Sequence, residues 1–227
     1  MTAPLVIDVV SDVVCPWCFI GKHRLEQAIA LRPDIPVEIR WRPYFLNDWV
    51  PREGIARDEY LTKKFGSPER YKSIAGRVSA AAAAEGLTYN VDGISRQPNT
   101  TDCHRLILWA GNSGDTGNAG KMKQRLMELY FTEGADLTER EVLVKAAADC
   151  GMDADLTREL LASDRDVDRV SAEVEQAKQA GIDGVPFFIL GGVLAVSGAQ
   201  DPIYLADAMA RAAEEVEKRG SAATAAE

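Results

Sequence analysis

The chain has 227 residues, which is enough for one large domain or two small ones with a substantial hydrophobic core. Apolar residues make up 46% of the sequence and charged residues 27%, as in an ordinary globular protein. A formal net charge of -9 disfavours nucleic acid as a partner, because binding to a phosphate backbone needs clustered Lys and Arg.

The N-terminal apolar stretch is short. It runs from Leu5 to Val10, is interrupted by Asp8, and has no basic residue before it. This is too short for the apolar region of a signal peptide or for a membrane span, so we expect no membrane association and a cytoplasmic location. Structural disulfides are rare in the cytoplasm. The four cysteines, at positions 15, 18, 103 and 150, are therefore expected to be reduced, catalytic or metal-bound.

The first fifty residues predict a strand, a helix and a second strand. Leu5 to Val10 is rich in β-branched residues and predicts a buried strand. Apolar residues near helical spacing predict a helix from Phe19 that ends at Arg32-Pro33-Asp34. Val37 to Trp41 alternates apolar with charged residues, as a half-buried strand does. This order favours a βαβ unit with parallel strands.

The middle of the chain predicts helices separated by glycine and proline, and no strand of comparable quality between about residues 48 and 166. We therefore expect an inserted all-helical domain over residues 51–165. The predicted helices are Glu59 to Phe65, Glu69 to Glu85, Asp102 to Gly111, Lys121 to Glu133, Glu139 to Cys150 and Leu156 to Leu161.

The C-terminal part predicts a helix, a strand hairpin and a last helix. The segments are a helix from Val167 to Ala180 ended by Gly181, a strand from Val185 to Leu190, a turn at Gly191-Gly192, a strand from Val193 to Val196, and a helix begun by Asp201-Pro202. With the N-terminal unit, this order is that of a thioredoxin-like α/β fold, in which helices flank a central mixed sheet. We assign residues 1–50 and 166–220 to that domain and residues 221–227 to a flexible tail.

The run Cys15-Pro16-Trp17-Cys18 lies between the first strand and the first helix. At this spacing on the first turn of a helix, two cysteine side chains reach disulfide distance. Unpaired N–H groups and the helix dipole stabilise a thiolate, so we expect Cys15 to be exposed, nucleophilic and of lowered pKa. Cys18 is expected to be more buried and to resolve the mixed disulfide. Pro16 suits the first helical position, and Trp17 places a large ring beside the sulfur.

Two other interpretations of the cysteine pair are weaker. A chance pair within a helix would have no function, but the position at a strand–helix junction is the one a thioredoxin-like redox motif requires. A structural zinc site needs a second close pair of ligands, and His104 beside Cys103 is a poor substitute because neighbouring side chains rarely point at one ion. We therefore predict a redox pair and no metal.

With these residues in place, the chain resembles the DsbA family of thioredoxin-like proteins, in particular its FrnE-like cytoplasmic branch. The resemblance extends over nearly the whole chain, and its more specific motifs lie near the two ends. The segments that carry it are Ser11-Asp12-Val13-Val14-Cys15-Pro16-Trp17-Cys18-Phe19-Ile20-Gly21, Arg42-Pro43-Tyr44-Phe45-Leu46-Asn47, Asn99-Thr100, His104-Arg105-Leu106, Gly184-Val185-Pro186-Phe187-Phe188 and Gly198-Ala199-Gln200.

The resemblance implies dithiol–disulfide exchange and a cis peptide bond between Val185 and Pro186. From the residues alone, Pro186 is a proline at the start of a strand, which any sheet permits. In the family this proline faces the turn that carries the two cysteines, Cys15 to Cys18 here, which we call the redox turn. Val185 would offer backbone groups to an extended substrate. The superfamily also contains 2-hydroxychromene-2-carboxylate isomerases and kappa-class glutathione transferases. These typically carry serine where Cys15 stands and lack the second cysteine, so the pair favours redox chemistry.

The remaining polar candidates have structural alternatives. Asp12 is expected to accept backbone hydrogen bonds near the turn, with proton transfer for Cys18 as the alternative. His104 is expected to be a satisfied structural histidine, with an approach to the redox turn as the alternative, and His23 is expected to be solvated. Cys103 departs from the small residue expected in the family. It is expected to be buried, with a part in the exchange as the alternative.

Asn99, Phe45 and His104 are the candidate substrate-binding residues. Phe45 is a candidate wall of an apolar groove, although core packing explains it equally well, and Asn99 begins a segment that would border the site.

The sequence predicts a protein-disulfide oxidoreductase. Its partners would be proteins or small molecules that carry a disulfide or thiol, with no bound cofactor and glutathione as a possible redox co-substrate. Two further classes stay open, namely an isomerase or glutathione-dependent transferase, and a peptide-binding module like a chaperone. A monomer and a homodimer are both compatible with the sequence, and neither the substrate nor the net direction of exchange follows from it.

Overall fold

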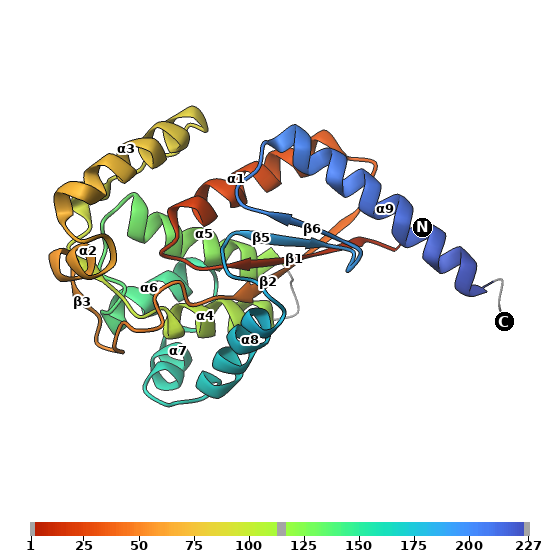
Figure 1. Cartoon of the computed structure of the whole chain (residues 1–227). Coiled ribbons are helices and arrows are strands. Elements are labelled where there is room, and N and C mark those ends of the chain that lie inside the picture. The colour runs from red at the N-terminus through yellow and green to blue at the C-terminus, as the bar shows by residue number, and fades with distance from the viewer. Residues whose placement is uncertain (1–2, 113–116, 225–227) are drawn as a thin grey trace.

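A computed structural model describes residues 3–112 and 117–224 of the chain. Its main sheet has the strand order β2-β1-β5-β6 (Figure 1). The strands are β1 Leu5–Ser11, β2 Val37–Pro43, β5 Phe187–Leu190 and β6 Leu194–Ser197. β1 runs parallel to β2 and antiparallel to β5, and β6 returns antiparallel beside β5. The mixed sheet expected for a thioredoxin-like fold is therefore confirmed, with the parallel βαβ unit and the hairpin at Gly191-Gly192.

Nine α-helices and one 3-10 helix complete the described part of the chain. They are α1 Pro16–Leu31, α2 Arg57–Phe65, α3 Pro68–Ala84, α4 Thr101–Gly111, α5 Gly117–Phe131, α6 Arg140–Asp149, α7 Ala154–Leu161, α8 Val167–Gln179 and α9 Pro202–Thr224, with the 3-10 helix at Val91–Gly93. Every expected helix is present. The largest difference at a boundary is the start of α5, which begins at Gly117 rather than Lys121.

Helices cover both faces of the sheet (Figure 1). Ile7 and Val9 of β1 point to one face, where they pack with Phe188 against α1 and α9. Val10 points to the other face and joins Ile182, which follows α8. Because both faces of β1 are covered, its sequence is a nearly continuous apolar run. β2 lies at the edge and is only partly buried, which explains its alternating sequence.

Two short strands were not expected from the sequence. β3 Ile55–Ala56 pairs antiparallel with β4 Arg96–Gln97, inside the region for which only helices were predicted. The expectation of no strand there was wrong, because a strand of two residues is too short to show an alternating pattern. The pair joins the segment before α2 to the segment before α4.

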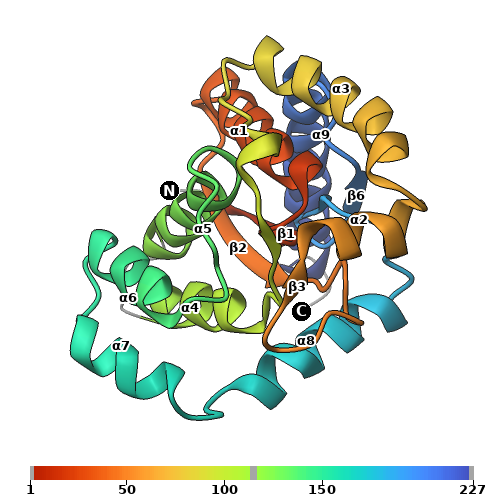
Figure 2. The same ribbon diagram turned by 90° about the vertical axis from the view of Figure 1, so that its left-hand side faces the viewer.

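The inserted helices surround the end of the sheet at which β1 leads into α1 (Figure 2). Helices α4 and α5 also contact β2 directly. Residues of the redox turn, including Val13 and Phe19, belong to the same apolar cluster as residues of α4, α5 and α6. The helical segment thus shares a core with the sheet, and its division into a separate domain stays a prediction.

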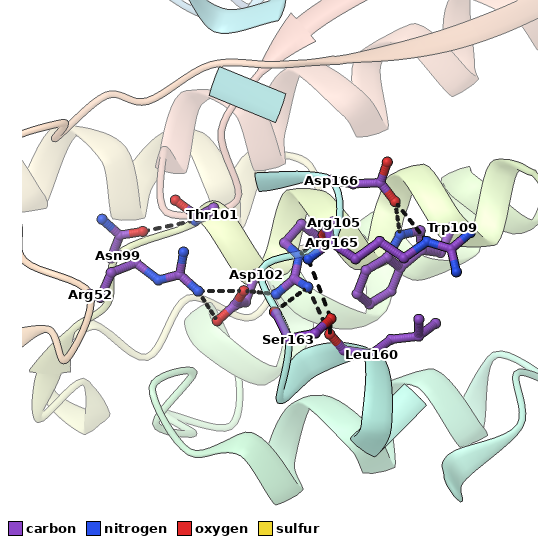
Figure 3. A network of polar contacts seen from close by, with 10 residues as sticks. All are labelled: Arg52, Asn99, Thr101, Asp102, Arg105, Trp109, Leu160, Ser163, Arg165 and Asp166. Atoms are coloured by element: carbon purple, nitrogen blue, oxygen red, sulfur yellow. Dashed lines mark hydrogen bonds and ion pairs between the residues drawn. The ribbon is translucent and has the colours of Figure 1, made fainter. Parts of the chain in front are cut away.

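A buried arginine joins α4 to the end of α7 and to the segment between α7 and α8 (Figure 3). The Arg105 side chain is fully buried, and its Nη2 donates to the carbonyl oxygens of Leu160 and Ser163, each at 2.7 Å. Its Nε donates to the carbonyl of Arg165 at 2.7 Å, and its Nη1 donates to Asp102 Oδ1 at 2.6 Å. These bonds hold α4 against the end of α7 and the segment that follows it.

The C-terminal helix is longer than expected. The N–H of Ile203 donates to Asp201 Oδ1 at 2.8 Å, as the predicted cap requires, and Gly181 follows α8 with a φ of 83°. α9 continues through residues 221–224 of the segment assigned to a flexible tail, and residues 225–227 lie outside the described residues. Within the described ranges, no helix is long and apolar enough to cross a membrane.

Candidate active site

The run from Cys15 to Cys18 lies at the N-terminus of α1, directly after β1 (Figure 1). Cys15 is the N-cap residue and Pro16 is the first residue of the helix. The N–H groups of Cys18 and Phe19 donate to the carbonyl of Cys15 at 3.0 and 3.2 Å. Proline is favoured at this first position because its missing N–H would have no partner there. The predicted position at a strand–helix junction is confirmed.

Cys15 and Cys18 are both free and both buried. Only 3% of Cys15 and 1% of Cys18 are exposed. The expectation that Cys15 is exposed was wrong, because the helical segment and the loop before β5 both close over the turn. Trp17, between the two cysteines, is the exposed residue, with 39% of its surface accessible.

The two thiols have opposite acidities. The pKa of Cys15 is lowered, chiefly by a hydrogen bond from the Cys18 thiol and also by the N–H groups of Cys18 and Trp17, which together outweigh burial. The pKa of Cys18 is raised well above its ordinary value, first by burial and then by the neighbouring Cys15 sulfur. Cys15 is thus the better thiolate and Cys18 holds its proton, which is the division expected for a nucleophile and a resolving thiol.

The loop before β5 lies against the redox turn. The peptide bond between Val185 and Pro186 is cis, as the resemblance implied. Cys15 Sγ donates to the carbonyl oxygen of Val185 at 3.6 Å. Gly21 of α1 faces Pro186 closely, since a Cβ atom on Gly21 would lie 2.8 Å from Pro186 Cγ. The structure therefore brings Val185 and Pro186 beside the cysteines.

A buried polar cluster lies behind the redox turn. Asp12 accepts from the N–H of Val13 at 2.7 Å and from the N–H of Leu46 at 2.9 Å, which confirms its expected backbone role. His104 Nε2 lies 3.3 Å from Asp12 Oδ1 and 3.2 Å from the carbonyl of Tyr44. Burial lowers the pKa of His104. Burial would raise the pKa of Asp12, but hydrogen bonds and positive charge around it prevail and lower that pKa. His104 is thus a satisfied structural histidine that nonetheless reaches the redox turn through Asp12.

Lys123 is a member of this cluster that the sequence analysis missed. It lies on α5, is 1% exposed, and donates from Nζ to the carbonyl of Ser11 at 3.2 Å. Burial lowers its pKa, while the neighbouring Cys18 and Asp12 act in the opposite direction. A signal was present in the sequence. Lys123 precedes the buried residues Leu126, Met127 and Tyr130 by three, four and seven positions, the spacing of one helical face.

A cavity of about 300 Å³ opens beside Cys15. The redox turn and the segment Gly184-Val185 form one side of it, and side chains from α2, α3 and α5 form the other. Most of its lining is aromatic or aliphatic, and Tyr60, Tyr71 and Phe131 are examples. Arg57 and Lys64 of α2 are the two cations in the wall, and the sequence analysis did not single out either of them.

The candidate substrate-binding residues lie outside the lining of this cavity. Asn99 donates from Nδ2 to the carbonyl of Val50 at 2.8 Å and accepts from the N–H of Thr101 at 3.0 Å (Figure 3 shows the second bond). The Phe45 ring lies 5.9 Å from the ring of His104. Their neighbour Leu46 lines the cavity instead. A binding role for Asn99, Phe45 and His104 stays a prediction.

The other cysteines and His23 lie apart from the cavity. Cys103 is fully buried, and burial raises its pKa, so the buried interpretation of this residue is confirmed. Cys150 is partly exposed at the end of α6, in a hollow beside the edge strand β2. His23 is half-buried rather than solvated. The described residues contain no group of three or more His, Cys, Asp or Glu side chains that could hold a metal ion.

Known proteins resemble this chain in sequence and in structure. A model of the DSBA-like thioredoxin domain family matches residues 6–210. A probable DsbA oxidoreductase from Streptomyces coelicolor is 32% identical, with a TM-score of 0.81 over 92% of this chain and 89% of that chain. The protein YwbO of Bacillus subtilis is 26% identical over 202 residues, which are 87% of this chain and 92% of YwbO.

Two more distant solved structures share the fold. The cytosolic disulfide reductase DsbM of Pseudomonas aeruginosa, solved with glutathione, is 17% identical, with a TM-score of 0.61 over 94% of this chain and 98% of DsbM. A 2-hydroxychromene-2-carboxylate isomerase is 16% identical, with a TM-score of 0.70 over 94% of this chain and 98% of that chain. At these identities the likeness concerns the fold alone.

Proposed function

Because the chain belongs to the DSBA-like thioredoxin domain family, we propose that it is a thiol–disulfide oxidoreductase with Cys15 as nucleophile and Cys18 as resolving thiol. One observation carries this proposal. The two free thiols at the start of α1 have opposite acidities, and the more acidic one borders a cavity. A thiolate is the reactive form of cysteine. A protonated neighbouring thiol stays unreactive until the mixed disulfide has formed.

The exchange has two steps. The Cys15 thiolate attacks one sulfur of a substrate disulfide, so that a mixed disulfide forms and the first substrate thiolate leaves. Cys18 then gives its proton to water or to the released thiolate and attacks Cys15 Sγ, which closes the Cys15–Cys18 disulfide and releases the second thiolate. The dithiol is oxidised by two electrons and the substrate is reduced to two thiols. The same steps in reverse would oxidise a dithiol substrate.

Neighbouring residues have supporting roles in this proposal. The carbonyl of Val185 accepts from Cys15 Sγ while that thiol is protonated. Once Cys15 is a thiolate, the carbonyl would be available to a backbone N–H of an extended substrate. Pro186 packs against Gly21 and thereby fixes the distance between the loop and α1. Pro16 begins the helix at the position where its ring is favoured, and the exposed Trp17 ring is available to a substrate.

Protein and small-molecule disulfides are both proposed substrates, and glutathione is the first thiol to test as a co-substrate. The likeness in fold to a disulfide reductase solved with glutathione supports that choice. We also propose a cytoplasmic location, where thiols remain reduced, and the four free cysteines are compatible with it.

Reduction of insulin by dithiothreitol tests the proposal. The wild-type protein is expected to accelerate the reduction, and Cys15→Ser is expected to abolish the acceleration because no other thiol borders the cavity. Cys150→Ser is the matched control, since it removes a partly exposed thiol that does not line the cavity beside Cys15 and should retain the wild-type rate. Equal rates for wild type and Cys15→Ser would exclude the proposed function.

The same variants separate the other two classes. Glutathione-dependent turnover that persists in Cys18→Ser would favour an isomerase or transferase, because those reactions need no resolving thiol. Suppression of aggregation by a Cys15→Ser, Cys18→Ser double variant, without any redox activity, would favour a peptide-binding module.

A further inference from the structure

We infer that the cavity beside Cys15 selects low-molecular-weight disulfides that carry a carboxylate next to an aromatic or apolar group. The inference rests on the proposed function, because it names the substrate class of the same thiol. Three features of the cavity support it, namely its size, its aromatic wall and two cations that have no carboxylate partner among the residues described.

The size and lining fit a small molecule. A cavity of about 300 Å³ lies at the lower end of the range typical of small-molecule sites. Aromatic rings from three different helices, such as Tyr60, Tyr71 and Phe131, form much of its wall. Such a wall favours flat apolar groups through burial and ring contacts. Cys15 lies in the same lining, so a bound disulfide would be next to the nucleophile.

Apart from the Cys15 thiolate, the cavity wall carries positive charge without negative charge. Arg57 and Lys64 line it, and no Asp or Glu is among the described residues that do. Within the described ranges, neither cation forms an ion pair, whereas Arg32 and Arg158 each hold a carboxylate through Nε and Nη2. The Cys15 thiolate favours the charged form of Lys64, but it is one negative charge in a wall with two half-buried cations. An anionic ligand would supply a further counter-charge and lower the cost of burying both cations.

Neutral groups hold both cations in place. Arg57 Nη1 donates to Gln97 Oε1 at 2.9 Å and to the Tyr130 hydroxyl at 3.2 Å, and its Nη2 donates to the Tyr71 hydroxyl at 3.2 Å. Its Nε–H and one Nη2–H have no partner among the described residues. In Arg32 and Arg158, the corresponding Nε–H and Nη2–H groups donate to the two oxygens of one carboxylate.

Lys64 is fixed in the same manner, by a hydrogen bond from Nζ to Asn47 Oδ1. The amide nitrogens of Asn47 and Gln97 are buried and have no hydrogen-bond partner within the part of the chain that the structure describes. Each amide thus leaves its own nitrogen unsatisfied while its oxygen binds a cation of the wall. Buried polar groups are seldom left unpaired, so this arrangement favours a specific role for the two cations.

The redox step is the one already described, with the protein dithiol as reductant. Cys15 attacks the disulfide sulfur, the anionic thiolate leaves, and Cys18 resolves the mixed disulfide. A carboxylate held by Arg57 and Lys64 would orient the disulfide toward Cys15 and would change neither the electron count nor the leaving group.

The test compares two aromatic disulfides that differ in charge. The reduced protein is mixed with dithiobis(nitrobenzoate), which carries carboxylates, or with neutral dithiodipyridine, and thiol release is followed by stopped flow. Lys64→Met and Arg57→Met are each expected to slow the anionic disulfide by about tenfold relative to the neutral one. The neutral disulfide corrects for any change in the acidity of Cys15.

Lys63→Met is the matched control. Lys63 is the neighbouring residue on α2, is exposed, stacks on Trp49 and does not line the cavity, so its variant should keep the wild-type ratio. Lys64→Arg should restore most of the preference, because it keeps the charge. An unchanged ratio in both Lys64→Met and Arg57→Met would overturn the inference.

A second measurement does not depend on disulfide exchange. Iodoacetate and iodoacetamide alkylate Cys15 and have nearly the same shape, but only iodoacetate is charged. The ratio of the two rates is expected to fall in Lys64→Met and to stay constant in Lys63→Met, and a constant ratio in both would count against the inference. Failure of both aromatic disulfides to react with wild-type protein would instead contradict the proposed function.

Discussion

The reactivity of Cys15 depends on the groups that face its sulfur. Because the Cys18 thiol and two backbone N–H groups lower the pKa of Cys15, alkylation by iodoacetamide should have its midpoint below the ordinary thiol pKa of about 8.5. The sign follows from the thiolate being the reactive form, so a lower pKa preserves the rate at lower pH. Cys18→Ala removes the largest stabilising contribution and should move the midpoint upward. A midpoint that does not move would show that the backbone N–H groups alone lower the pKa of Cys15.

Lys123 should act on the second step more than on the first. Its ammonium lowers the pKa of Cys18, which burial otherwise raises. Lys123→Met should therefore reduce the thiolate fraction of Cys18 and lengthen the lifetime of the mixed disulfide by about tenfold, for one pKa unit. Mass spectrometry of quenched samples measures that lifetime.

The same variant distinguishes a specific effect of Lys123 on Cys18 from a general loss of structure. Met removes a buried charge without opening a large cavity, so the variant should remain folded. Its pH profile for resolution should shift upward, while the alkylation of Cys15 changes less. An unchanged profile, or equal effects on both steps, would exclude a specific role for Lys123.

At the scale of elements, the helices and strands that could be predicted from the sequence are those with a local pattern, such as a capping residue or a regular apolar spacing. Helices α3 and α7 begin where Ser67 and Asp153 accept hydrogen bonds from the N–H groups three residues later, and both caps are visible in the sequence. β3 and β4 have no local signal, because two residues cannot alternate. Their pairing depends on contacts between segments about forty residues apart.

Arg105 should contribute strongly to the stability of the inserted helices. It is fully buried and donates to three carbonyl groups and to Asp102 (Figure 3). Arg105→Met should lower the free energy of unfolding by about 3 kcal/mol, because it removes several short hydrogen bonds made by a charged donor that is fully buried. Urea denaturation measures the change.

Arg52→Met is the control for that prediction. Arg52 pairs with the same Asp102 at 3.0 Å, but it is exposed. Arg52→Met should lower the free energy of unfolding by less than about 1 kcal/mol, as is usual for surface ion pairs. Similar losses in the two variants would show that the ion pair, rather than the bonds to the carbonyls, carries the stabilisation.

At the scale of the whole molecule, the redox pair could be predicted and its surroundings could not. Cys15 and Cys18 are close in sequence, and their spacing at a predicted strand–helix junction indicates the chemistry. Arg57, Lys64 and Lys123 reach the site only through the packing of α2 and α5 around the end of the sheet. In the sequence, Arg57 and Lys64 look like ordinary solvated charges. Their proximity to Cys15 is a property of the tertiary fold. The burial of both thiols under the helical segment and the loop before β5 is another such property.

The stability of the whole protein should depend on its redox state and on pH. A group whose folded pKa is lowered stabilises the fold above its unfolded pKa, and this contribution is lost as pH falls through the folded pKa. Only the reduced protein has the Cys15 thiolate, so below the ordinary thiol pKa of about 8.5 its free energy of unfolding relative to the oxidised protein should fall as pH is lowered. Above that pH, the raised pKa of Cys18 acts in the opposite direction. The disulfide closes too short a loop to add much chain entropy. Urea denaturation of both forms across pH measures the difference. The Cys15→Ser, Cys18→Ser variant should lack this pH dependence, and a difference that rises toward acid would contradict a stabilised thiolate.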